Sequence, residues 1–467
     1  MQTREMVERE GLVANHPFCK VSRMQYRKRR GQALVLAILA LTLLTVAAVS
    51  LSTTARLEVR AARRGIDEVQ REAALRGAVN RGLALLEQGR SDPETLRSTL
   101  ERYGQLSWAP FSPDESETAP QLEVAVQVLD GSSRIDINRA EAEQLKKLPG
   151  MTERAVRAIV SWRDEESKDK YNVGPRPYEV KRRPYDTVEE LLLVRDVDSR
   201  AFFGAPTMRE TSELAAPPIS EWLSPLAGEN NVDAGGEARV DVNSAGVEEL
   251  LTAANRVQPA VTPEQLQNLM QKRQQRESTQ KSRPLFKSVT EALREAGVEE
   301  RQWGLVLDAW TVDTRSFLPG RINVNTASPA VLRTMPGVSS DLVQEIVRRR
   351  AEKPEGVVWS DLLELSAGAG QQTDTPSTGD ASSPQSGGMQ PDQMEKLFSV
   401  RSSVYLVRCL IRERGSSRID AGSALVYWPA STDEAATIVQ WRKPDRFPGW
   451  TAWFRPLLEN EESAGDR

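Results

Sequence analysis

The most constraining feature of the sequence is an apolar run of 24 residues without a charge, residues 32–55. About 20 apolar residues are enough to cross a bilayer as an α-helix. Five basic residues stand before this run: Arg23, Arg27, Lys28, Arg29 and Arg30. Such a cluster favours retention of the N-terminus in the cytoplasm. We therefore predict one membrane-spanning helix, with the bulk of the chain on the far side of the membrane.

The helix is predicted to continue well beyond the membrane. No proline occurs between Pro17 and Pro93, so nothing interrupts a helix from about residue 32 to about residue 87. Such a helix is roughly 80 Å long at a rise of 1.5 Å per residue. Apolar residues recur at helical spacing in its second half. We predict a transmembrane part at residues 32–55 and an amphipathic continuation at residues 56–90.

Gly31 lies directly between the basic cluster and the apolar run. A prepilin signal is cut after such a glycine, which would make residues 1–31 a leader and Gln32 the first mature residue. A plain membrane anchor and a cleaved secretory signal are the alternatives, but a secretory signal has a shorter apolar core. Leu36 occupies the fifth mature position, where pilin-like subunits carry a glutamate that packs between helices.

The composition excludes several classes of site. The net charge of −4 gives no global attraction to nucleic acid or anionic lipid, although it leaves room for local basic patches. The only histidine, His16, lies in the predicted leader, which excludes histidine-based triads and metal sites from the mature chain. Cys19 and Cys409 do not determine the redox compartment. No phosphate loop, nucleophile elbow or metal motif occurs, so we predict no enzyme and assign no cofactor.

A short phrase of alternating apolar and polar residues occurs three times, at residues 134–138 (RIDIN), 239–243 (RVDVN) and 321–325 (RINVN). Each phrase is typical of a short strand that stops at an asparagine suited to a turn, and these asparagines are Asn138, Asn243 and Asn325. Helical segments follow each copy. This self-similarity predicts three related helical units of about 70 to 100 residues.

Two of the units place a Pro-Gly turn between their first two helices: Pro149-Gly150 and Pro336-Gly337. The second helices are expected at residues 153–163, 263–273 and 340–350, with Arg163, Arg273 and Arg350 at matching positions. A third, capped helix is expected to begin at Thr187, Ser288 and Ser360.

Helix, Pro-Gly turn and helix form a helix-hairpin-helix pattern. Versions that bind DNA have a second glycine, which lets backbone N–H groups approach a phosphate. This chain has Thr152 and Ser339 there, and both suit the N-cap of the following helix. We therefore favour a packing role for the turns, with DNA binding as the alternative.

Alternating residues near both ends of the helical region predict a small antiparallel sheet from residues 119–138 and 397–430. The fold class is then α+β: a long N-terminal helix packs on a pilin-like sheet, and an all-α domain of helix-hairpin-helix-like repeats, residues 139–365, is inserted into it. Residues 366–391 have the composition of a disordered linker. Residues 431–467 form a tail whose tryptophans, Trp441, Trp450 and Trp453, we expect to pack back on the core.

Three segments carry a resemblance to a known family: residues 29–34 (RRGQAL), 185–195 (YDTVEELLLVR) and 320–329 (GRINVNTASP). With most of residues 28–412, they resemble type II secretion system protein K, also called general secretion pathway protein K. The resemblance implies a minor pseudopilin with an inserted helical domain, located at the tip of the periplasmic pseudopilus.

The same resemblance implies a location and partners. The chain would be a single-pass inner-membrane protein with a cytoplasmic N-terminus, cut by prepilin peptidase and joined to other minor pseudopilins and inner-membrane proteins of the secretion system. Lack of the glutamate at Leu36 is typical of this class. Members of the family also bind calcium through acidic side chains, but no segment here has a recognisable calcium-loop spacing, so no ligands are assigned.

The alternative function is a membrane-anchored helix-hairpin-helix receptor for DNA uptake, because such receptors also join an anchor to Asn-Thr-Ala and Pro-Gly motifs. They favour a double-glycine turn and a basic surface. The single glycine in each turn, the net negative charge and the flanking strands favour the secretion subunit.

Overall fold

The computed structural model describes most of the chain. The described residues are 29–90, 92–111, 122–148, 150–171, 177–203, 218–256, 259–279, 284–369, 389–416, 418–431 and 433–443. The leader residues His16 and Cys19, and the tail residues Trp450 and Trp453, lie outside them. The chain divides into two units, residues 1–70 and 71–467.

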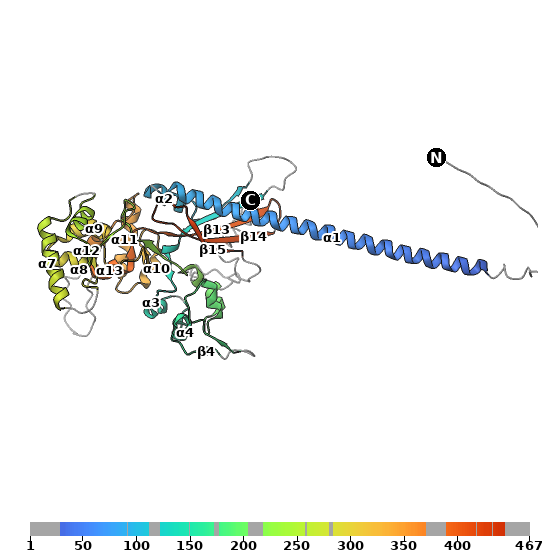
Figure 1. The fold of residues 1–467 in the computed structure, drawn as a ribbon, viewed down its shortest axis with the longest axis horizontal. Coiled ribbons are helices and arrows are strands. Elements are labelled where there is room, and N and C mark those ends of the chain that lie inside the picture. The colour runs from blue at the N-terminus through green and yellow to red at the C-terminus, as the bar shows by residue number, and fades with distance from the viewer. Residues whose placement is uncertain are drawn as a thin grey trace, which may run out of the picture. The chain divides into compact units, whose positions relative to one another are not determined.

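The first unit consists, where it is described, of a single helix. Helix α1, Arg29–Gln88, has 60 residues and confirms the predicted unbroken helix (Figure 1). Every described side chain from residue 33 to residue 70 is exposed in the isolated chain. The helix is long and apolar enough to cross a membrane. Its apolar side chains therefore have no protein core to pack in and suit a lipid environment.

The second unit contains a five-stranded antiparallel sheet in the order β1-β2-β13-β14-β15. The strands are β1 Trp108–Pro110, β2 Leu122–Asp130, β13 Val404–Glu413, β14 Ile419–Tyr427 and β15 Thr437–Arg442. Strand β13 pairs with β2 from Tyr405↔Asp130 to Glu413↔Leu122, so segments far apart in the sequence form the centre of the sheet. The predicted antiparallel sheet is confirmed.

The end of α1, from Arg71, packs on one face of this sheet. Leu75, Val79 and Leu86 are buried there against strand residues such as Val126 and Val407. Gly82 permits the close approach, because a Cβ at this position would lie 2.5 Å from Cγ1 of Val407. Helix α2, Pro93–Arg102, follows with Asp92 as its N-cap and a proline in its first turn.

Strand β15 corrects the prediction of a tail beginning at residue 431. Residues 437–442 pair with β14 and add a fifth strand to the sheet. Trp441 packs partly buried against the core beneath α1, as expected for the tail tryptophans. The strand escaped prediction because its six residues, TIVQWR, carry exposed apolar side chains rather than a regular alternation.

The repeats form three modules, each opened by a short strand and closed by another strand that pairs with it in parallel. The first module, residues 134–224, contains β3 Ile135–Asp136, α3 Ala142–Lys146, α4 Glu153–Arg163, β4 Lys170–Tyr171, β5 Tyr178–Glu179, the 3₁₀ helix η2 Val188–Leu193, α5 Ser199–Phe203, η3 Ile219–Glu221 and β6 Leu223–Ser224.

The other two modules have longer helices. The second module, residues 239–311, contains β8 Val240–Asp241, α6 Val247–Ala254, α7 Pro263–Thr279, α8 Val289–Ala296, α9 Glu300–Ala309 and β9 Trp310–Thr311. The third module, residues 321–399, contains β11 Ile322–Asn323, α10 Pro329–Thr334, α11 Ser340–Glu352, α12 Trp359–Ala369, α13 Pro391–Leu397 and β12 Phe398–Ser399. Strands β7 Gly228–Asn230 and β10 Phe317–Pro319 pair with each other on either side of the second module in sequence.

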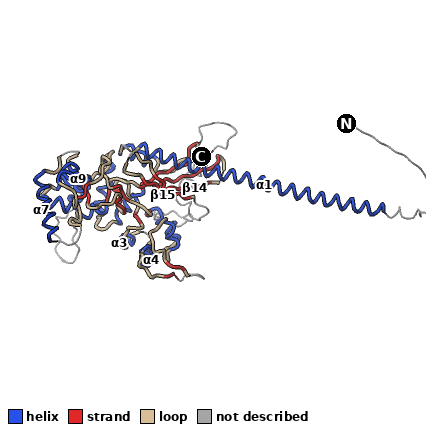
Figure 2. Tube along the Cα trace, in the orientation of Figure 1, coloured by secondary structure: helices blue, strands red, loops and turns tan. Residues whose placement is uncertain are grey.

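These modules correct two predicted boundaries. The inserted region is not all-α, because each module is closed by a pair of short strands (Figure 2). The inserted region also continues past residue 365, to strand β12. The predicted linker, residues 366–391, is narrower than expected at both ends. Helix α12 runs to Ala369, Met389 is buried, and α13 begins at Pro391. The rest of that segment lies outside the described residues.

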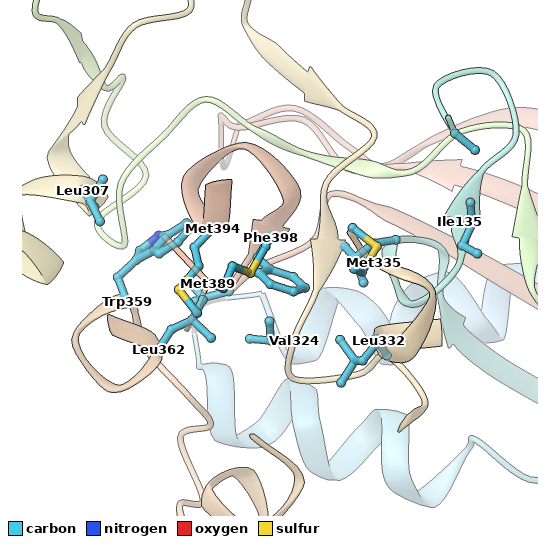
Figure 3. Close-up of a cluster of buried hydrophobic side chains, with 14 of the residues drawn as sticks. Ile135, Leu307, Val324, Leu332, Met335, Trp359, Leu362, Met389, Met394 and Phe398 are labelled. Carbon is cyan, nitrogen blue, oxygen red and sulfur yellow. The ribbon is translucent and has the colours of Figure 1, made fainter. Parts of the chain in front are cut away.

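One hydrophobic core runs through all three modules. Its third-module part is shown in Figure 3, where Phe398 and Val324 lie between Trp359 on one side and Met335 and Leu332 on the other. Each of these side chains is at most 3% exposed. The modules therefore fold as one body, which holds their equivalent turns in fixed positions.

Candidate functional site

The final asparagine of each repeated phrase clamps a distant segment of its own module. In the third module, Asn325 Nδ2 donates to the carbonyl oxygens of Val357 (2.9 Å) and Val400 (3.0 Å). The backbone N–H of Val357 donates back to Asn325 Oδ1 at 2.7 Å. One amide thus satisfies three backbone groups that would otherwise be buried without partners.

The first two modules repeat this arrangement. Asn138 exchanges the same pair of hydrogen bonds with Tyr185 and also donates to the carbonyl of Pro225. Asn243 exchanges the pair with Phe286. The sequence predicted turn residues at these positions, and the structure adds a long-range role that local spacing does not reveal.

The matching arginines on the second helices hold the turn after each clamp. Arg273 donates to the carbonyl oxygens of Val242 (3.4 Å) and Ala245 (2.7 Å). Arg350 makes the equivalent bonds to Val324 and Ala327, and Arg163 makes them to Ile137 and Ala140. A charged donor on two carbonyl oxygens fixes the distance between the opening phrase and the second helix.

An acidic side chain then secures the start of the third helical segment in each module. In the second module, Glu291 accepts a hydrogen bond from the Lys287 N–H (2.7 Å) and pairs with Arg276. Glu190 does the same with Asp186 and Lys181 in the first module. In the third module, Asp361 accepts from Val358 and pairs with Lys353.

The predicted caps of these third segments are confirmed in the second module and corrected in the third. Ser288 accepts a hydrogen bond from the Glu291 N–H at 3.0 Å, as an N-cap does. Thr187 is the N-cap of the short 3₁₀ helix η2, and its backbone N–H donates to the Glu190 carboxylate at 3.3 Å. Ser360 is not a cap, because α12 already begins at Trp359 and Asp361 takes the capping role.

Two glutamates, the buried Glu229 and the partly buried Glu221, join the modules to each other and to the sheet. Glu229 receives Arg239 of the second module (3.1 Å) and Arg321 of the third module (2.9 Å). Burial opposes ionisation of Glu229, but these two guanidinium groups outweigh it and lower the pKa of the carboxyl. Strand β7, the second module and the third module thus meet at one carboxylate.

Glu221 has the corresponding role for the first module. It pairs with Arg134 at 2.9 Å and with Arg408 of β13 at 2.7 Å. Burial again acts against ionisation, and the two arginines overcome it and lower the pKa of Glu221 to about 2. The opening arginine of every repeated phrase therefore has a glutamate partner, which the sequence did not reveal because the glutamates lie outside the repeated phrases.

A buried aspartate joins the sheet to the third module. Asp130, at the end of β2, accepts hydrogen bonds from Asn323 Nδ2 (2.8 Å) and Thr326 Oγ1 (2.5 Å). Burial raises the pKa of Asp130 above its ordinary value, although these bonds favour the charged form. The sheet and the modules are consequently linked by polar contacts as well as by packing.

The Pro-Gly turns of the first and third modules lie next to each other. Gly150 and Gly337 have positive φ values of 75° and 76°, where glycine is favoured. Lys147 donates to the carbonyl oxygen of Met335 at 3.2 Å, across the two turns. Pro336 belongs to the described turn, whereas Pro149 lies outside the described residues.

The residues after these turns cap helices, as predicted. Thr152 Oγ1 accepts from the Ala155 N–H and Ser339 Oγ from the Leu342 N–H, each at 3.1 Å. Because these positions hold hydroxyl groups engaged with their own helices, they do not offer the close glycine approach that phosphate binding uses.

The predicted processing residues lie in α1. Gly31 and Gln32 belong to its helical span, and their side chains are outside the description. Leu36 is 65% exposed in the isolated chain. The structure does not bring these residues together with the clamps, since they belong to different units.

A small cleft lies between the first module and the sheet, with a volume of about 90 Å³. Its lining includes Phe202, Leu406, Arg408 and Glu221. The charges of Arg408 and Glu221 already pair with each other. Among the described residues, no group of three or more His, Cys, Asp or Glu side chains could hold a metal ion. The polar residues described above join parts of the protein to one another.

Comparisons with known proteins found one matching family model and a similar solved structure. The model of the family "Type II secretion system (T2SS), protein K" matches residues 322–382. A solved structure, the GspK-GspI-GspJ complex from the type 2 secretion system of enterotoxigenic Escherichia coli, contains a similar chain. That chain has 11% sequence identity and a TM-score of 0.34, with 82% of this chain and 100% of the other covered. No curated protein sequence matches. The family model covers 61 of the 467 residues, and its family is the one that the sequence resembles, type II secretion system protein K.

Proposed function

We propose that this chain is a minor pseudopilin, a structural subunit at the tip of the pseudopilus that supports protein secretion across the outer membrane. The family match at residues 322–382 is the observation that carries the proposal. Helix α1 supports it, because one continuous helix has a fully exposed apolar part and an end packed on an antiparallel sheet. A subunit of this design acts by assembly, not by chemistry.

In this proposal α1 first lies in the inner membrane, with the N-terminus in the cytoplasm and the modules in the periplasm. Prepilin peptidase cuts between Gly31 and Gln32. The neutral side chain of Leu36 then offers no acid to the N-terminus of a neighbouring subunit. A subunit without that pair suits the tip, where no further subunit packs above it. Other minor pseudopilins and inner-membrane proteins of the secretion system are its partners.

N-terminal mass spectrometry of the protein purified from its native host tests the processing step. We expect a mature chain that starts at Gln32. An intact N-terminus would reduce the proposal to a plain membrane anchor, which does not enter a pseudopilus.

The tip position is tested with a Leu36→Glu variant. We expect a glutamate here to change assembly, because it would add a buried acid able to attract another subunit's N-terminus. Pseudopilus length and the secretion of cargo by the host measure the effect. A variant that assembles and secretes as the wild type does would contradict the role of Leu36.

DNA uptake is the competing function, and a gel shift separates the two. The hydroxyl caps at Thr152 and Ser339 favour little binding, because they occupy the position of the second glycine. We expect weak binding of duplex DNA at physiological salt. Tight binding that weakens steeply as salt rises would favour the receptor instead.

A further inference from the structure

Four arginines of α1 form one face of the helix directly after its apolar run: Arg56, Arg60, Arg63 and Arg64, here called the arginine face. At about 100° per residue, their side chains occupy a sector roughly 100° wide. The only acid between Arg56 and Arg64, Glu58, lies on the opposite side of the helix, and Asp67 follows one turn after Arg63 and Arg64. All four arginines are exposed in the structure.

The position of this face along the helix corresponds to the surface of a membrane. The uncharged run of residues 32–55 is about 36 Å long as a helix, and the hydrocarbon core of a bilayer is about 30 Å thick. Arg56 then lies just beyond the hydrocarbon, in the layer of headgroups. Arg63 and Arg64 begin about 10 to 12 Å further along the axis.

Helix geometry brings the more distant arginines back to the same layer. The Cα–Cβ bonds of an α-helix tilt toward its N-terminus, so side chains after a span lean toward the membrane. Long arginine side chains also extend toward headgroups while their apolar stems cover the helix. All four guanidinium groups can therefore reach one ring of headgroups.

Between Arg56 and Arg64 no acid shares the face of the four arginines, so their charges lack a counter-charge within this segment. Like charges three and four residues apart repel each other on a helix. No ion pair or hydrogen bond joins the arginine face to another side chain in the part of the chain that the structure describes, whereas Arg71 further along bonds Asp420 at 2.6 Å. Basic residues after the span also oppose the orientation favoured by the basic leader.

We propose that the arginine face binds the phosphate headgroups of anionic phospholipids, such as phosphatidylglycerol, in the leaflet on the C-terminal side of the span. The contact anchors α1 at a defined depth in the membrane. This proposal needs only that α1 crosses a membrane, so it can fail or succeed independently of the secretion role. Guanidinium groups suit this partner because they bind phosphate oxygens in a bidentate manner.

The test uses the full-length protein in neutral detergent, titrated with phosphatidylglycerol or with phosphatidylcholine and followed by native mass spectrometry. We expect phosphatidylglycerol to bind more tightly, since each arginine near an anionic surface contributes roughly fivefold in affinity. In the variant R56Q/R60Q/R63Q/R64Q, the preference should disappear. A variant with lysine at the four positions should keep most of it.

The matched control removes four other exposed arginines, R154Q/R157Q/R301Q/R333Q, from the modules. It changes the net charge equally and should keep the lipid preference of the wild type. The proposal is overturned if the glutamine variant keeps the preference, or if the control loses it to the same degree. It is also overturned if the glutamine variant binds lipid as the wild type does but no longer assembles with other subunits, because the arginines then pair with protein.

Discussion

The first and second modules use the same skeleton to hold very different contents. Both begin with a strand and an asparagine clamp, place an arginine across the turn, and secure the third helical segment with a glutamate. The second module fills this skeleton with full α-helices. The first uses the 3₁₀ helix η2 and a short hairpin of β4 and β5.

The aromatic content shows the same difference. In the first module Trp162 stacks on Tyr171 at 6.0 Å between ring centroids, and Tyr178 meets both rings edge-on. In the second module the corresponding space is filled by helix α8 on α7, with Arg276 over Phe286 at 4.6 Å. The two modules therefore share their polar clamps, whereas the packing between the clamps differs.

The largest predicted effect comes from the carboxylates that bind the opening arginines. Glu229→Gln removes the charge that faces Arg239 and Arg321, and leaves the buried Arg239 with the more distant carboxylate of Asp308 at 3.8 Å. We expect a loss of about 3–5 kcal/mol of stability, because a broken buried ion pair leaves an uncompensated charge. Chemical denaturation followed by tryptophan fluorescence measures it.

Glu221→Gln is the matched comparison in the first module. Its side chain is 26% exposed, against 1% for Glu229, so water can compensate part of the loss. We expect Glu221→Gln to lose less stability than Glu229→Gln. Equal losses of stability would show that exposure of Glu221 to solvent does not matter, and would contradict the difference between the two modules.

The asparagine clamps give the second largest effect. Asn325→Ala leaves three backbone groups without their partner, and Asn243→Ala leaves two. At about 1 kcal/mol or more for each buried unsatisfied group, the third module should lose more stability than the second. Hydrogen exchange measured by mass spectrometry on each module reads the two losses separately.

An aspartate at the same positions serves as the control for the clamps. It keeps the oxygen that accepts the backbone N–H but loses the amide donors. Asn325→Asp should therefore remain destabilised. Exchange rates equal to those of the wild type would mean that the Nδ2 bonds contribute nothing.

A third prediction concerns the middle residue of the repeated phrase, which is Asp136 in the first module and Asn323 in the third. Both accept the N–H of the clamp residue two positions on. Burial raises the pKa of Asp136 to about 6. Asp136→Asn should stabilise the first module at neutral pH by about 1–2 kcal/mol, because it removes a buried charge and keeps the acceptor.

The stability gained by Asp136→Asn depends on pH, because the pKa of Asp136 is raised in the folded state. A carboxyl with a higher pKa in the folded state binds its proton more tightly when folded, so the charged form costs stability. The cost is absent below pH 3.8, the unfolded value, and complete above about pH 6. Glu221, with its pKa lowered to about 2, does the opposite, and its contribution is lost as the pH falls from 4.5 toward 2. A gain from Asp136→Asn that is equal at pH 3 and pH 7 would contradict the assignment.

The sequence predicted the parts of this fold that local patterns encode. The long helix follows from the proline-free run, and the modules follow from the repeated phrase and the spacing of Arg163, Arg273 and Arg350. The caps at Thr152 and Ser339 were recognised because capping acts within three residues.

Other parts could not be predicted because they depend on long-range partners. The closing strands β6, β9 and β12 have two residues each, too few for any periodic signal. The partners of the clamps lie 32 and 75 residues away for Asn325, and 47 and 87 residues away for Asn138. Glu221 and Glu229 lie outside the repeated phrases, and only the folded chain brings them to the opening arginines.

The smallest predicted effect tests the turn that ends the third helical segment. Asp196 of the first module and Gly297 of the second both have left-handed backbones, with φ of 66° and 77°. The space around Gly297 is open, since no atom lies within 4 Å of an added Cβ. Gly297→Ala should therefore cost only the backbone strain, about 1 kcal/mol.

Gly297→Asp should cost less than Gly297→Ala, because aspartate tolerates the left-handed region better than alanine does. Asp196→Gly should change stability by only a few tenths of a kcal/mol, since relief of strain is offset by the greater freedom of glycine in the unfolded chain. Thermal unfolding of the three variants gives the order. If Gly297→Asp were as costly as Gly297→Ala, aspartate would have no advantage at this turn. The backbone of Asp196 would then be fully strained in the folded first module. The 3₁₀ helix η2, which precedes it, would have to compensate for that strain.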